Sequence, residues 1–167
     1  MNLKDFEKKK DELIDSCKIL DFQFGDTKYY EYKIGDYKFT TIYGYFHEEK
    51  LYSVQIRGEH MEYTSYDELM TGQSIALYKI LKTKYGMPNQ NYAIPDWYTL
   101  NHGDSNCLAF WKMGDKIVEM RIEKFRTNYY LNLEIFQSSI SSKLEDEKRE
   151  RKIKEEKEKV QKATEIL

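Results

Sequence analysis

Three histidines are the residues best suited to metal binding or acid–base chemistry in this chain: His47, His60 and His102. Two of them stand beside carboxylates, in His47-Glu48-Glu49 and Glu59-His60-Met61-Glu62. Imidazole and carboxylate groups together can hold a divalent metal. Their spacing matches no metal-ligand motif, however, and polar residues of this kind are common in turns. We therefore predict solvated loops at these positions, with no metal site and no cofactor.

The other reactive side chains also lack a motif. Cys17 and Cys107 are the only cysteines and belong to no Cys-x-x-Cys pair. We interpret both as small buried residues, with a disulfide between them as the alternative. The chain contains no phosphate-binding glycine loop, no His-Glu-x-x-His and no Gly-x-Ser-x-Gly. No catalytic residue is assigned, and the sequence favours a protein that is not an enzyme.

Charge and hydropathy narrow the class of partner. The 27 basic and 29 acidic residues nearly balance, whereas a nucleic-acid binder usually has a basic excess. The 15 tyrosines could form a stacking platform for single strands, but half-buried strand tyrosines are the ordinary explanation. The N-terminus has no apolar leader and no run of residues is long and apolar enough for a membrane span. We therefore expect a cytoplasmic protein without membrane or nucleic-acid contact.

Hydrophobic periodicity predicts the elements that must position these groups. Helices are expected over 3–19 and 66–85, the second preceded by a Ser65/Glu68 capping box and followed by Gly86 and Pro88. Strands are expected over 19–24, 28–34, 37–46, 50–57, 97–101, 106–113, 116–125 and 129–136. Each predicted helix is therefore followed by four predicted strands.

This pattern indicates an internal repeat. Gly35-Asp36, a tight-turn dipeptide, recurs as Gly114-Asp115, while Phe46 and Ile56 recur as Phe125 and Ile135. We predict two helix-plus-four-strand units, 1–58 and 65–137, within a single duplicated domain, 1–140. The alternative is two unrelated meanders that share common hairpin residues.

Alternation along the strands predicts the fold class and its two faces. One row is mostly apolar and should face the helices: Phe39, Thr41, Tyr43 and Tyr45 with Tyr52, Val54 and Ile56 in one unit, and Val118, Met120, Ile122 and Lys124 with Leu131, Leu133 and Ile135 in the other. The predicted fold is α+β: one curved antiparallel sheet with the helices on one face and the other face open.

The open face carries the candidate binding residues: Tyr29, Glu31, Lys33, Ile42, Arg57, Phe110 and Arg121. Its basic members, Lys33, Lys38, Arg57, Lys112 and Arg121, are offset by the acidic Asp21, Glu31, Glu119, Glu123 and Glu134. This balance leaves no positive stripe for phosphates.

The tandem helix-plus-meander units resemble the duplicated saddle of the TATA-box-binding-protein-like fold. They also resemble the tandem modules of beta-lactamase-inhibitor-protein and small-protein-A type. The stretch Leu-Lys-Thr-Lys-Tyr-Gly-Met-Pro, 81–88, looks like that of many small bacterial α+β proteins. The resemblance covers 1–136 and is topological, so it implies a curved sheet and transfers no functional residue.

The last segment, 141–167, is dominated by charged residues and predicts a helix. Acid-first i,i+4 pairs such as Glu145–Arg149 and Glu147–Arg151 stabilise helices without tertiary contacts. Ile153, Val160 and Leu167 recur every seventh residue, which hints at a self-association seam. We expect a solvated projecting helix, with weak homo-oligomerisation, a partner helix, or docking along the body as alternatives.

The function that follows is a non-enzymatic module that binds an unknown protein partner through the open sheet face, the C-terminal helix, or both. The alternative is a module that binds a small molecule or nucleic acid.

Overall fold

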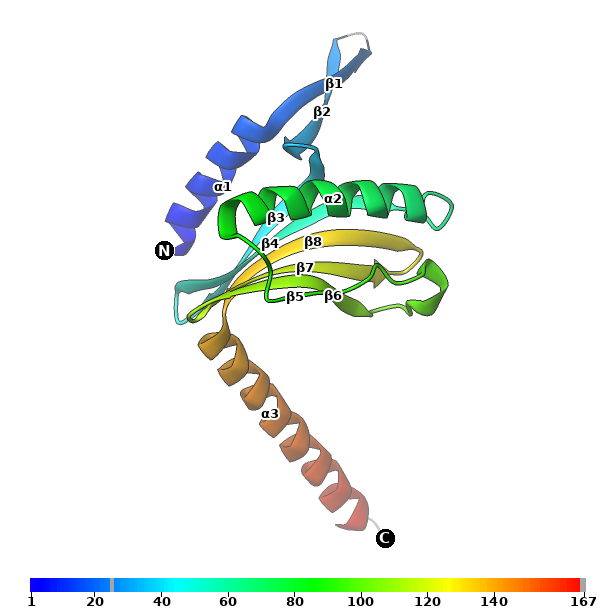
Figure 1. Ribbon diagram of the computed structural model, residues 1–167. Helices are drawn as coiled ribbons and strands as arrows, with labels where there is room; N and C mark the ends of the chain where they lie inside the picture. Colours follow the sequence, from blue (N-terminus) through cyan, green and yellow to red (C-terminus); the bar gives the residue numbers. More distant parts are fainter. Residues whose placement is uncertain (25, 166–167) are drawn as a thin grey trace.

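The computed structural model describes residues 1–24 and 26–165, which form an α+β structure of one antiparallel sheet and three α-helices (Figure 1). In chain order the elements are α1 (Leu3–Cys17), β1 (Lys18–Phe24), β2 (Thr27–Ile34), β3 (Tyr37–His47), β4 (Lys50–Met61), α2 (Tyr66–Tyr85), β5 (Gln90–Asn91), the 3-10 helix η1 (Trp97–Thr99), β6 (Ser105–Met113), β7 (Lys116–Phe125), β8 (Asn128–Gln137) and α3 (Ser138–Glu165). The predicted fold class is confirmed.

The sheet has the order β1-β2-β3-β4-β8-β7-β6-β5, and every neighbouring pair is antiparallel. The two halves of the chain meet where β4 pairs with β8, with Val54 opposite Ile135. Strand β2 pairs with β3 over three residues only, from Ile34 to Tyr32. The β1–β2 hairpin consequently leaves the main sheet and extends away from it (Figure 1).

The predicted strand 97–101 is wrong. Trp97–Thr99 form a 3-10 helix, and the strand that pairs with β6 at the sheet edge is the two-residue β5. The segment before η1 is held by a side-chain hydrogen bond instead of by strand pairing. The Tyr66 hydroxyl donates to the Pro95 carbonyl at 2.8 Å. Proline has no backbone amide to donate to a neighbouring strand. Residues 97–136 therefore hold three strands instead of the four expected, and the internal duplication stays a prediction.

Helices α1 and α2 cover one face of the sheet, and the apolar rows of β7 and β8 are confirmed as its core. Val118, Ile122 and Leu131 are fully buried. Helix α1 reaches β3 through Phe6, whose ring stands 2.6 Å from where a Cβ on Gly44 would lie. Only glycine leaves room for that ring, so Gly44 fixes where α1 packs.

In β3 the predicted faces are wrong after Phe39. A β-bulge between Phe39 and Thr41 adds one residue, and an extra residue moves every later side chain to the other face. Ile42, predicted on the open face, is therefore 5% exposed and belongs to the core. Tyr43 and Tyr45, predicted to face the helices, are each 41% exposed and face outward.

Helix α3 starts directly after β8 and projects away from the body (Figure 1). Its first turn is held by Asp115 in the β6–β7 turn, whose Oδ1 accepts from the Ser139 amide at 2.8 Å and from Ser138 Oγ at 2.9 Å. These hydrogen bonds, that of the Ser139 amide first, lower the pKa of Asp115. The start of α3 is therefore anchored to the sheet.

Beyond its first turns, α3 is stabilised by ion pairs between its own side chains. The predicted pair Glu147–Arg151 is present at 3.9 Å, whereas Arg149 pairs with Asp146 at 4.0 Å instead of Glu145. Ile153 of the predicted seam is exposed, and the side chain of Val160 and all of Leu167 lie outside the described residues. Self-association through α3 stays a prediction.

Deleting residues 145–167 should leave the melting temperature of the body nearly unchanged, because the Asp115 anchor and every core residue remain. Differential scanning calorimetry of the full chain and the truncated chain measures this. A fall of more than ~4–8 °C, the shift that roughly 1 kcal/mol produces in a small domain, would show that the distal helix packs on the body.

Candidate functional site

A depression of about 770 Å³ lies on the sheet face opposite α1 and α2. Its floor is formed by outward side chains of the central strands, and the first turns of α3, including Ser138, Ser142 and Glu145, form one wall. We call this depression the basin. Its size falls within the range of known ligand sites.

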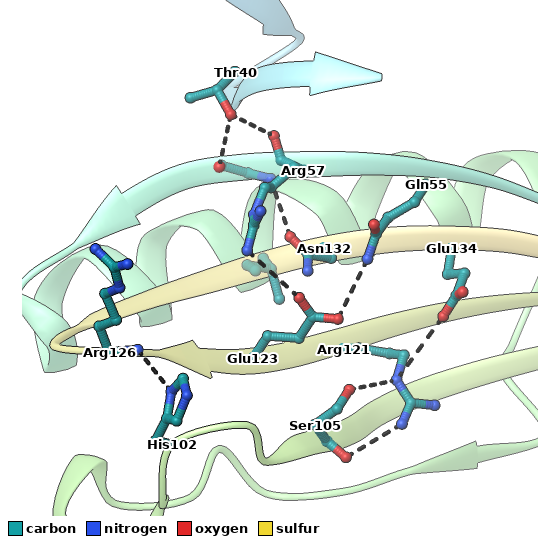
Figure 2. A network of polar contacts seen from close by, with 12 residues as sticks. Thr40, Gln55, Arg57, His102, Ser105, Arg121, Glu123, Arg126, Asn132 and Glu134 are labelled. Atoms are coloured by element: carbon teal, nitrogen blue, oxygen red, sulfur yellow. Dashed lines mark hydrogen bonds and ion pairs between the residues drawn. The ribbon is translucent and has the colours of Figure 1, made fainter. Parts of the chain in front are cut away.

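Arg121 of β7 is the centre of the polar network in the basin (Figure 2). Its Nε donates to Ser105 Oγ at 2.9 Å and its Nη2 to the Ser105 carbonyl at 3.2 Å. Its Nη1 donates to Glu119, and its Nε lies 4.0 Å from Glu134 Oε2. These contacts join β6, β7 and β8, so Arg121 is fixed in place instead of free to meet a partner.

A second set of contacts crosses from β4 to β7 (Figure 2). Gln55 Nε2 donates to Glu123 Oε1 at 3.3 Å, and Glu123 Oε2 lies 3.9 Å from Arg57 Nη2. The Arg57 guanidinium stacks 4.2 Å from the centre of the Tyr130 ring. Tyr45 extends this chain of contacts, because its hydroxyl donates to Gln55 Oε1 at 3.1 Å.

Two polar side chains are buried on this face without all their hydrogen bonds. Asn132 is fully buried; its Oδ1 accepts from the Gly58 amide at 3.3 Å, while its Nδ2 has no partner among the described residues. Ser53 lines the basin, and its buried Oγ also lacks a partner in the described part of the chain. Buried polar atoms are normally satisfied, so Ser53 marks a place in the basin lining where a ligand or water would gain a hydrogen bond.

The basin is electrostatically negative. Burial raises the pKa of Glu134; Arg121 opposes that shift, whereas the neighbouring Glu119 and Glu123 add to it. Burial, followed by Glu134 and Glu123, also raises the pKa of Tyr45. Burial is the main cause of both shifts and the neighbouring carboxylates add to it; perturbed groups of this kind gather at functional sites.

Replacing Glu134 by Gln should stabilise the protein at pH 7. The carboxylate has a pKa near 4.5 when unfolded and a higher one when folded, so the native protein loses stability as pH rises through that interval. Glutamine cannot ionise, and the gain should vanish at pH 4. Melting temperatures at the two pH values measure this. A variant less stable than the parent at pH 7 would show that the ion pair with Arg121 outweighs the cost of burial.

The structure brings together two of the seven predicted binding residues. Arg57 and Arg121 belong to the network, whereas Ile42 lies in the core. Glu31 and Lys33 form a separate cluster with Lys38, in which Glu31 pairs with the two lysines at 2.5 and 2.6 Å. Phe110 is half-buried beside β5 on the row of Glu119 but does not line the basin. The side chain of Tyr29 lies outside the described residues.

Sequence reasoning missed the residues that complete the site: Tyr45, Ser53, Gln55, Ser105 and the wall from α3. Gln55 could have been found, because it stands between Val54 and Ile56 and must face away from the core. The serines at 138–142 carried no such signal.

No protein-family model matches the chain, and no curated protein or solved structure shows significant similarity to it. The resemblances considered from the sequence therefore stay expectations, and the function must be argued from the site.

Other chemistry is sparse in the described part of the chain. It holds no group of three or more histidine, cysteine or acidic side chains placed to share a metal. His102 accepts from the Arg126 amide at 2.9 Å, which ties two loops together (Figure 2). Cys17 and Cys107 are both free thiols, and burial, followed by Glu119, raises the pKa of Cys107. Within residues 1–24 and 26–165, none of the helices has the length and apolar character of a membrane span.

Proposed function

We propose that this protein is a non-enzymatic interaction module whose basin binds a positively charged segment of a protein partner. The observation that carries the proposal is the charge of the basin lining. Four glutamates line the basin: Glu119, Glu123, Glu134 and Glu145. Arg121 is the only basic residue that lines it in the described structure. A partner lysine or arginine would neutralise carboxylates that already repel one another.

The stability that the protein loses by burying the Glu134 carboxylate supports this proposal. A carboxylate whose pKa is raised by burial destabilises the free protein at neutral pH, and such residues are commonly kept because they bind or react. Tyr45 and Tyr52 add aromatic rings at the basin, and a cation gains further by contact with an aromatic face. The basin therefore offers both kinds of group that favour a cationic side chain.

The proposal joins the two surfaces that the sequence indicated. Because α3 forms a wall, a segment in the basin would touch both the sheet and the helix. The negative lining argues against nucleic acid, whose phosphates would be repelled. A cytoplasmic setting fits the two free cysteines, since thiols stay reduced there.

Fluorescence anisotropy with labelled hexalysine and hexaglutamate peptides tests the proposal. We expect the full chain to bind hexalysine and not hexaglutamate. The double variant Glu119→Gln/Glu134→Gln should weaken binding by about tenfold or more, because it removes the two carboxylates closest to Arg121.

The matched control is Glu150→Gln/Glu155→Gln, which removes the same charge from exposed positions on α3. This control should bind hexalysine as the parent does. If both double variants lose affinity equally, the attraction is to overall charge and the basin is not the binding site. Circular dichroism of each variant confirms that the fold is intact.

A further inference from the structure

A second pocket, of about 540 Å³, lies on the helix side of the sheet and is separate from the basin. One wall is α2, which contributes Ser74, Ile75 and Tyr78. The other wall is the extended stretch 91–94, and Leu108 and Met120 of the sheet form the floor. Apart from the rim, the lining is apolar.

The pocket is held open by hydrogen bonds at both ends of its second wall. The Asn89 and Tyr92 amides donate to the carbonyls of Phe110 at 2.8 Å and Leu108 at 2.7 Å. Beyond the pocket the Tyr66 hydroxyl holds the Pro95 carbonyl at 2.8 Å. The wall therefore cannot collapse onto α2 without losing these bonds, and a preformed apolar pocket is the common form of a small-molecule site.

One polar group inside this pocket has no partner. Ser74 is 7% exposed, and its Oγ makes no hydrogen bond in the part of the chain that the structure describes. A helical serine can bond to the carbonyl one turn before it, and Ser74 makes no such bond. The unpaired hydroxyl of Ser74 is therefore available to an oxygen atom of a bound molecule.

The mouth of the pocket is positively charged. Lys79 and Lys82 line it from exposed positions on α2, no acidic residue lines it, and neither lysine has an ion-pair partner among residues 1–24 and 26–165. Lys82 stands two helical turns after Ser74, on the same face of α2. An apolar molecule in the pocket could thus place an anionic group between the two lysines.

From the apolar walls and the two lysines at the mouth, we infer that this pocket binds an apolar small molecule with a carboxylate head, of the medium-chain fatty-acid class, in which an oxygen atom at the far end of the chain can accept from Ser74. The carboxylate pairs with Lys79 and Lys82, and the chain lies along α2 over Leu108 and Met120. This site does not depend on the partner proposed for the basin.

The test compares decanoate, decanol and decylammonium by NMR of the ¹⁵N-labelled full chain. We expect decanoate to bind most tightly, with amide shifts confined to 74–82, 91–94 and the adjoining sheet. Lys79→Gln/Lys82→Gln should weaken decanoate by about tenfold, while the control Lys152→Gln/Lys154→Gln on exposed α3 should not. Ser74→Ala should lower affinity for 10-hydroxydecanoate, whose far hydroxyl can accept from Ser74, more than for decanoate.

A charge change at the mouth makes the result decisive. Ile75 is 51% exposed, so Ile75→Glu should fold normally. This variant should weaken decanoate binding and narrow its preference over decylammonium, because the new carboxylate offsets one of the two lysine charges, while hexalysine binding to the basin should not change. Equal affinity of the parent for all three ligands, or shifts outside the pocket, would overturn the inference.

Discussion

Replacing Gly58 by Ala is expected to lower the free energy of unfolding by about 3 kcal/mol, the upper end of the cost of overpacking. A Cβ at this position would lie 2.2 Å from the Leu131 carbonyl oxygen of the neighbouring strand. That oxygen cannot move aside easily, because it accepts a hydrogen bond from the buried Tyr37 hydroxyl at 2.8 Å. Strands β4 and β8 would have to separate where the two halves of the chain meet. Urea denaturation measures the change.

Gly72→Ala is the matched control. Gly72 lies inside α2, and a Cβ there meets no atom within 4 Å. Alanine is favoured over glycine in helices, so this variant should gain roughly 0.5–1 kcal/mol. The two substitutions should therefore change stability in opposite directions. A Gly58→Ala protein as stable as the parent would mean that β4 and β8 do not approach as closely as described.

Truncating Leu133 to Ala should cost about 2–5 kcal/mol, the range for a large aliphatic side chain in a packed core. Leu133 is 7% exposed and lies on β8 opposite Ile56 and Met120, both buried. The smaller residue would leave a cavity under the centre of the sheet. Chemical denaturation with an unchanged slope would attribute the loss to the native core.

Val54→Ala serves as the comparison for Leu133. Sequence alternation places the two residues in equivalent rows, but Val54 is only half-buried and packs at the edge of the core. We expect its truncation to cost about 1 kcal/mol, the low end of core substitutions. Equal losses at both positions would show that the β3–β4 side of the sheet is packed as tightly as the β7–β8 side.

Patterns within a segment predicted most of the helices and strands. They failed where contacts between residues far apart in the sequence determine the local structure. Helix 66–85 was predicted with its observed bounds, because its apolar stripe and the Gly86 end lie within the segment. Even there the capping detail differs, since Ser65 Oγ donates to the Glu62 carbonyl and makes no side-chain cap. The strand expected over 97–101 failed because tyrosine hydroxyls from α2 and β8 hold that segment in another path.

The faces of β3 illustrate a second limit. Strict alternation assumes a regular strand, and a single bulge after Phe39 reverses the positions of Ile42 and Tyr45. Nothing in the local residues marks that bulge. Alternation placed Arg121, Glu119, Glu123 and Glu134 on the open face, and all four line the basin. It gave no sign of the wall, because that wall comes from the first turns of α3.

The 28 residues of α3 make it a lever about 42 Å long, at 1.5 Å per residue. Its pivot is the turn that Asp115 holds, and the same turns form a wall of the basin. A tilt of about 10° at the pivot would move the far end by roughly 7 Å over that length. A ligand that pressed on this wall of the basin would therefore displace the far end of α3 much more than its first turn.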